Sequence, residues 1–177
     1  MAVSRTWMRS VALAAVTALV TCAPTSVSAH PHPRPPAQLQ CQGTESVTYD
    51  PGVTLWPRKF DVRTDGQFDC TDSAGKVTSG SYGEHFSLTA GCIDLLGGFE
   101  EQRTFSWSTG DTSVVDASGS STAVAGQVIT TITGTVTRGR FLGRTAVQVI
   151  TLPQPGVLQC LTTGFTGAKG VTTLVIT

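Results

Sequence analysis

The chain has 177 residues, of which 40% are hydrophobic and 14% are charged, and its 12 Lys and Arg residues balance 12 Asp and Glu residues. This length suits a single domain. A net charge of zero, without a run of basic residues, gives no field that would attract the phosphates of nucleic acid, so we expect no nucleic-acid partner.

The N-terminus has the pattern of a secretory signal peptide. Arg5 and Arg9 precede an apolar stretch at 11–20 that is too short to span a bilayer. The small residues Val27-Ser28-Ala29 suit signal peptidase, so we expect a signal peptide over 1–29, cleaved after Ala29, and secretion of the remainder. No second hydrophobic segment follows, and we therefore expect no membrane span.

The cysteines predict two disulfides. Cys41, Cys70, Cys92 and Cys160 are even in number and contain no C-x-x-C pair, which in an oxidising compartment favours structural disulfides over a zinc site. Of the three pairings that four cysteines allow, we favour Cys41–Cys70 with Cys92–Cys160. The fifth, Cys22, leaves with the signal peptide. In an alternative interpretation it is the lipidated residue of a loose lipobox, and the protein is a lipoprotein.

Residues 30–40 contain four prolines and predict an extended, mobile segment before a single β domain over 41–177. Within that domain, Asp65-Gly66 predicts a type I′ hairpin turn between strands at 60–64 and 67–70. A helical turn is expected at 92–96, before two glycines. The other expected strands are 45–49, 77–82, 84–89, 103–108, 112–116, 127–137, 141–151, 157–161 and 171–176.

The segment 127–137 is the most informative for packing. Alternation puts Val128, Ile132 and Val136 on a core face, and threonines 131, 133, 135 and 137 on a face that meets water. We expect it to form a hairpin with 141–151. Short β-branched strands with frequent turns predict an all-β fold, either an antiparallel β-sandwich or a partly closed β-barrel, with disulfide staples.

Two histidines suggest a copper site as one hypothesis. Cleavage after Ala29 would make His30 the N-terminal residue, and an N-terminal histidine with its free amine begins a copper histidine brace. His85 is the available second ligand. The competing interpretation, which we favour, is that His30 and His32 are simply two histidines of a mobile Pro-rich tail.

No catalytic constellation is evident. The sequence contains no G-x-S-x-G motif, and Ser81 and His85 would lie about 13 Å apart on one strand face. The acids that could pair for glycoside cleavage or bind calcium are more simply solvated loop residues: Asp94, Glu100, Glu101 and Asp111. Trp56 and Trp107 could stack on sugars as a carbohydrate platform, although anchoring of the core is the favoured interpretation.

Several short motifs occur in order along the chain: Cys41 followed by Tyr49-x-Pro51-Gly52, Trp107-x-Thr109-Gly110, Gly134-Thr-Val-Thr-x-Gly139-x-Phe141-x-Gly143 and Gln159-Cys160-Leu161. The pattern covers most of 41–177 and resembles a group of small secreted actinomycete proteins without an assigned activity. The resemblance implies export and a β architecture, and it brings no catalytic residue or cofactor.

These patterns together predict an exported, non-enzymatic β protein that binds a ligand outside the cell or at its envelope. One alternative is a copper-dependent oxidoreductase that uses His30 and His85. The other is a small-ligand barrel, whose apolar cavity would be lined by the inward faces of 127–137 and 141–151.

Overall fold

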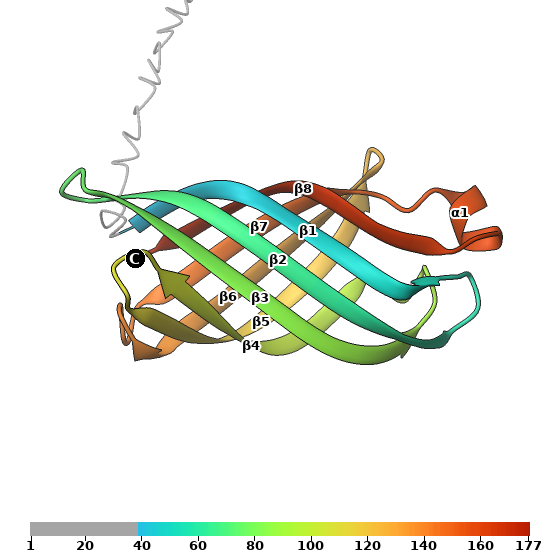
Figure 1. The fold of residues 1–177 in the computed structure, drawn as a ribbon, viewed down its shortest axis with the longest axis horizontal. Helices are drawn as coiled ribbons and strands as arrows, with labels where there is room; N and C mark the ends of the chain where they lie inside the picture. Colours follow the sequence, from blue (N-terminus) through green and yellow to red (C-terminus); the bar gives the residue numbers. More distant parts are fainter. Residues whose placement is uncertain (1–38) are drawn as a thin grey trace, which may run out of the picture. The chain divides into compact units, whose positions relative to one another are not determined.

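The computed structural model describes residues 39–177, which form a closed antiparallel barrel of eight strands (Figure 1). Each strand pairs with the next one in the chain, and β8 pairs with β1. The predicted all-β antiparallel fold with disulfide staples is thus confirmed, and of the two predicted forms the structure has the barrel, which closes through the pairing of β8 with β1. The elements are β1 (Leu39–Val53), β2 (Arg58–Asp72), β3 (Val77–Ala90), β4 (Gly97–Trp107), β5 (Thr112–Val124), β6 (Gln127–Gly139), β7 (Thr145–Pro153), α1 (Val157–Leu161) and β8 (Phe165–Ile176).

Strict alternation explains how these residues close a barrel. In β2 every second residue from Phe60 to Cys70 is buried, and the residues between them are exposed. The predicted pairing of 127–137 with 141–151 is confirmed as the ladder of β6 with β7, although residues 141–144 belong to the turn before β7, and Ile132 and Val136 are buried as expected. Within residues 39–177, no helical segment has the length and hydropathy that a transmembrane span requires.

Both predicted disulfides are confirmed. Cys41 and Cys70 face each other in the ladder between β1 and β2. Cys92, in the loop after β3, is bonded to Cys160 of α1 and ties two connections at the same end of the barrel. Two disulfides are consistent with an oxidising, extracellular location.

Several local predictions differ from the structure. Asp65-Gly66 lies inside β2, where it pairs with both β1 and β3 instead of forming a turn. Gly66 leaves space for Tyr82, because a Cβ there would sit 2.1 Å from the ring. The expected strands 77–82 and 84–89 form one strand, β3, and the expected strand at 157–161 is the helix α1. The helical turn expected at 92–96 is a series of turns, closed by hydrogen bonds such as Asp94 N to the Gly91 carbonyl. The barrel begins at Leu39, which is fully buried, two residues before the predicted domain start.

Aromatic side chains fill one end of the barrel, which we call the filled end. Phe68, Tyr82, Phe105, Trp107 and Phe141 contact one another in series, with ring centroids 5.5–5.9 Å apart along the path from Phe68 through Tyr82 to Phe141. The chain termini of the barrel lie here, and α1 lies at the opposite end (Figure 1). The close packing leaves this end without room for a ligand.

At the seam between β3 and β4, the two strands are hydrogen-bonded over only a short part of their length. Its ladder is limited to Gly80↔Trp107 and Ser81↔Ser106, whereas β2 and β3 pair along their whole length. Beyond Ser81 the two strands are joined through side chains, because Arg103 of β4 forms an ion pair with Glu84 of β3.

Removal of an aromatic side chain from the filled end should lower the free energy of unfolding far more than removal of one from the surface. Phe105 is 2% exposed, so Phe105→Ala should lower the free energy of unfolding by about 3–5 kcal/mol. Trp56 is 78% exposed, and Trp56→Ala should change it by less than about 0.5 kcal/mol. Urea unfolding of both variants measures the difference. Equal losses would contradict the assignment of the core.

Candidate functional site

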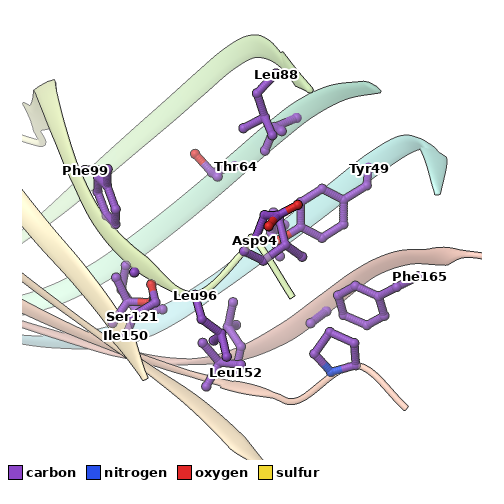
Figure 2. Close-up of a pocket in the computed structure, with 18 of the residues that line it drawn as sticks. Tyr49, Thr64, Leu88, Asp94, Leu96, Phe99, Ser121, Ile150, Leu152 and Phe165 are labelled. Carbon is purple, nitrogen blue, oxygen red and sulfur yellow. The ribbon is translucent and has the colours of Figure 1, made fainter. Parts of the chain in front are cut away.

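The half of the barrel near α1 encloses a cavity of about 980 Å³. Its wall is mainly apolar: Figure 2 shows Tyr49, Leu88, Phe99, Ile150 and Leu152 around it. The connections that follow β1, β3 and β7 surround its outer end, and the Cys92–Cys160 disulfide joins two of them. This volume is typical of the upper range of small-molecule sites.

The cavity also reaches the seam between β3 and β4. Phe86 of β3 and Phe99 of β4 line it from the two sides of the seam, and they are 44% and 38% exposed. Exposed phenylalanines on both sides of an interrupted ladder leave apolar surface that a bound molecule would cover.

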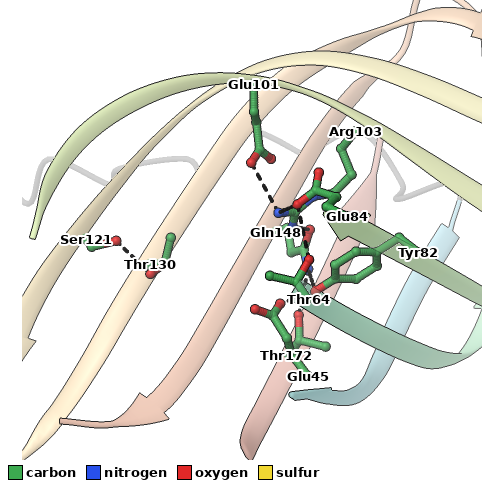
Figure 3. Close-up of polar contacts among 10 residues, drawn as sticks. All are labelled: Glu45, Thr64, Tyr82, Glu84, Glu101, Arg103, Ser121, Thr130, Gln148 and Thr172. Atoms are coloured by element: carbon green, nitrogen blue, oxygen red, sulfur yellow. Dashed lines mark hydrogen bonds and ion pairs between the residues drawn. The ribbon is translucent and has the colours of Figure 1, made fainter. Parts of the chain in front are cut away.

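Buried and partly buried polar residues contact one another inside the barrel (Figure 3), and five of them, Glu45, Thr64, Glu84, Glu101 and Arg103, line the inner end of the cavity. We call this group the polar cluster. It consists of Glu45, Thr64, Tyr82, Glu84, Glu101, Arg103, Gln148 and Thr172, contributed by β1, β2, β3, β4, β7 and β8.

Arg103 is the centre of the polar cluster and is 4% exposed. Its Nε and Nη2 donate to the two oxygens of Glu84, at 3.2 and 3.0 Å, and Nη2 also donates to Glu101 Oε2 at 3.2 Å. Nη1 donates to Gln148 Oε1 at 2.7 Å, and the guanidinium lies 4.5 Å from the Tyr82 ring centroid. Charge-assisted hydrogen bonds of this bidentate form compensate the cost of burying the ion.

The neutral members extend this network across the barrel. Gln148 Nε2 donates to the Tyr82 hydroxyl and to Thr172 Oγ1, both at 2.9 Å. The Tyr82 hydroxyl in turn donates to Glu45 Oε2, and Thr64 donates to Glu84. Almost every donor of the polar cluster is thus used by a protein acceptor.

The charges at this end of the cavity are unbalanced, with one guanidinium against three carboxylates. Burial raises the pKa of Glu101 to about 7, against the attraction of Arg103 and with a further contribution from Glu84 and Glu45. Burial also raises the pKa of Glu45. Burial alone would lower the pKa of Arg103, but Glu84 and Glu101 raise it overall. The guanidinium therefore stays charged, while Glu101 titrates near neutral pH.

Glu101 corrects an expectation. The sequence predicts it to be a solvated loop acid like Asp94, Glu100 and Asp111, yet it lies on β4 and points inward beside Arg103. Glu100 is exposed on the same strand, Asp94 lies in the loop after β3 and Asp111 lies in the turn after β4. Asp94 and Asp111 lie at opposite ends of β4, and the adjacent Glu100 and Glu101 point to opposite faces of that strand, so neither of these two pairs forms a catalytic pair.

The other predicted site residues do not belong to the polar cluster. Ser81 is exposed on β3, and His85 of the same strand is exposed at the rim of the cavity. Trp107 is buried and donates its indole N–H to Ser113, whereas Trp56 is 78% exposed rather than anchored in the core. The threonines 131, 133, 135 and 137 are exposed, as expected.

Residues 1–38 lie outside the described part of the chain, so the signal peptide, Cys22 and His30 stay predictions. The copper hypothesis is likewise a prediction, since one of its two ligands falls there. Among residues 39–177, no three His, Cys, Asp or Glu side chains are grouped to hold a metal ion.

The sequence reasoning missed the polar cluster. Its residues come from six strands that are far apart in the sequence. The one available signal was on β4, where Glu101 and Arg103 are spaced by two from Phe99 and Phe105 and so share the inward face with them. Comparison with known protein families, curated proteins and solved structures gave no match for this chain. The resemblance to small secreted actinomycete proteins therefore stays a prediction, and the site is interpreted from its own geometry.

Removal of the central cation should destabilise the barrel strongly. Arg103→Met leaves Glu84 and Glu101 buried without a counter-charge, and should lower the free energy of unfolding by about 3–5 kcal/mol. Urea unfolding at neutral pH measures this loss. The double variant Arg103→Met with Glu84→Gln should recover part of it. A loss below about 1 kcal/mol in the single variant would contradict the central role of Arg103.

The raised pKa of Glu101 predicts a pH dependence of stability. Between the ordinary carboxyl pKa and about 7 the folded protein holds a proton that the unfolded chain has released, so this group lowers stability as pH rises through that window. The free energy of unfolding of Glu101→Gln, relative to that of the wild type, should therefore increase by roughly 1–2 kcal/mol between pH 5 and pH 8, as measured by urea unfolding. Asp116→Asn, on the exposed outer face of β5, is the charge-matched control. If the free energies of unfolding of Glu101→Gln and the wild type differ by the same amount at pH 5 and pH 8, the raised pKa of Glu101 is refuted.

Proposed function

We propose that this protein binds a small, largely apolar molecule in the barrel cavity and performs no chemistry on it. The observation that carries the proposal is the contrast between the two halves of one barrel. Aromatic rings fill one half, whereas the other half is left open as a cavity of about 980 Å³ with an apolar wall. A side-chain-filled barrel of eight strands is the common outcome, so an open half indicates a ligand site.

The setting supports binding outside the cell. The two disulfides suit an oxidising compartment, and the signal peptide predicted over 1–29 would deliver the chain there. A secreted barrel of this form would capture a sparingly soluble molecule in dilute medium, or hold it at the envelope.

The sequence predicts that the inward face of 127–137 would line an apolar cavity. Three residues of that face on β6 line the cavity: Val128, Thr130 and Ile132.

The direct test is titration of the full chain with the neutral fluorescent probe N-phenyl-1-naphthylamine. We expect saturable one-to-one binding with enhanced, blue-shifted emission, because the probe moves from water into the apolar cavity. Absence of saturable binding would overturn the proposal.

A matched pair of variants locates the probe. Val128 of β6 lines the cavity, and its neighbour Ile129 lies on the other face of the strand. Val128→Trp should weaken probe binding by at least about tenfold by filling the cavity, while Ile129→Trp should leave it within about twofold. If Val128→Trp fails to fold by circular dichroism, Thr130→Phe fills the same cavity. Equal binding by both tryptophan variants would place the probe elsewhere and contradict the proposal.

A further inference from the structure

The hydrogen bonds at the inner end of the cavity restrict the chemistry of the ligand. Arg103 directs its donors to Glu84, Glu101 and Gln148, and the Thr64 hydroxyl donates to Glu84. The polar side chains that line this end therefore have few hydrogen bonds left to donate to a bound molecule.

Acceptors, in contrast, are in excess. Glu101 Oε1 is buried and has no hydrogen-bond partner among the described residues. Glu45 lines the cavity and is more than nine-tenths buried, and within residues 39–177 its carboxylate accepts one hydrogen bond, at Oε2 from Tyr82. Buried polar atoms are nearly always satisfied, so Glu101 Oε1 without a donor indicates a missing partner. The second oxygen of Glu45 is a further acceptor at the cavity wall with no donor among residues 39–177.

From this imbalance we infer that the ligand is a cationic amphiphile, with a protonated amine that donates to Glu101 and Glu45 and an apolar body among Phe99, Ile150 and Leu152. This inference rests on the proposed function, since it names the class of molecule that the cavity takes. One guanidinium faces three carboxylates there, so an ammonium group reduces the excess of negative charge, whereas a carboxylate ligand would increase it. A neutral alcohol could donate one hydrogen bond but would leave the excess charge in place.

The titratable groups around Glu101 predict the pH dependence of binding. Arg103 lies beside it on β4, Glu84 and Tyr82 face it from β3, and Glu45 faces it from β1. The cavity residues of β5, β6, β7 and β8 contribute no titratable group. Burial raises the pKa of Glu101 to about 7, and only the ionised form pairs with an ammonium ion. Amine affinity should therefore rise between about pH 6 and 8, with release of a proton on binding.

The experiment compares three ligands of equal chain length, decylamine, decanol and decanoate, by displacement of N-phenyl-1-naphthylamine from the full chain at pH 8. Decylamine should bind at least about tenfold more tightly than decanol, and decanoate should bind most weakly. Glu101→Gln should lower the preference for decylamine over decanol to less than about twofold, with Glu45→Gln as the second variant should the first fail to fold. Asp116→Asn, which removes a charge from the outer face, should retain the preference.

The outcomes separate the two proposals. If the probe binds and Val128→Trp blocks it, but decanoate equals or exceeds decylamine, the cavity function stands and the inference about charge is overturned. The same holds if neither Glu45→Gln nor Glu101→Gln changes the amine preference, or if none of the three ligands displaces the probe. If neither the probe nor any of the three ligands binds, as measured by calorimetry, the proposed function itself fails.

Discussion

The interior of this barrel depends on the buried guanidinium of Arg103. A charge 4% exposed is stable only when acceptors surround it, and Glu84, Glu101 and Gln148 provide them from β3, β4 and β7. One side chain thereby links strands across the barrel, including the seam where the ladder between β3 and β4 ends. The polar cluster that it organises also stops the aromatic packing of the filled end and leaves the remaining half of the barrel open.

Much of the fold could be predicted because its signals are local. Alternation and turn residues identified the hairpin of β6 and β7, and the cysteine count with an oxidising setting predicted both disulfides. The errors occurred where a tertiary contact overrides a local signal. Asp65-Gly66 has the composition of a turn, yet the glycine is required by the Tyr82 ring packed against it, a residue 16 positions away. At 157–161 the disulfide to Cys92 and the chain reversal into β8 favour a helical turn over a strand.

The candidate site could not be predicted in the same way. Glu45, Arg103 and Gln148 are 58 and 45 positions apart along the chain, and only closure of the barrel brings them together. The strand expected at 103–108 excludes Glu101, which the sequence therefore places in a loop, whereas β4 begins at Gly97. The informative signal was the spacing of Glu101 and Arg103 with Phe105, since these residues must share one face of β4. Such a pattern indicates a buried polar cluster only when the aromatic face is known to be the interior.

The central claim is that the cavity is a ligand chamber closed at its inner end by the polar cluster. A crystal structure of the full chain with N-phenyl-1-naphthylamine tests it most directly. The account predicts density for the probe inside the barrel, with its rings among Phe99, Ile150 and Leu152 and the contacts of Arg103 with Glu84 and Glu101 intact. A cavity closed by collapsed side chains, or one holding only ordered water with the probe bound on the outer surface, would contradict it.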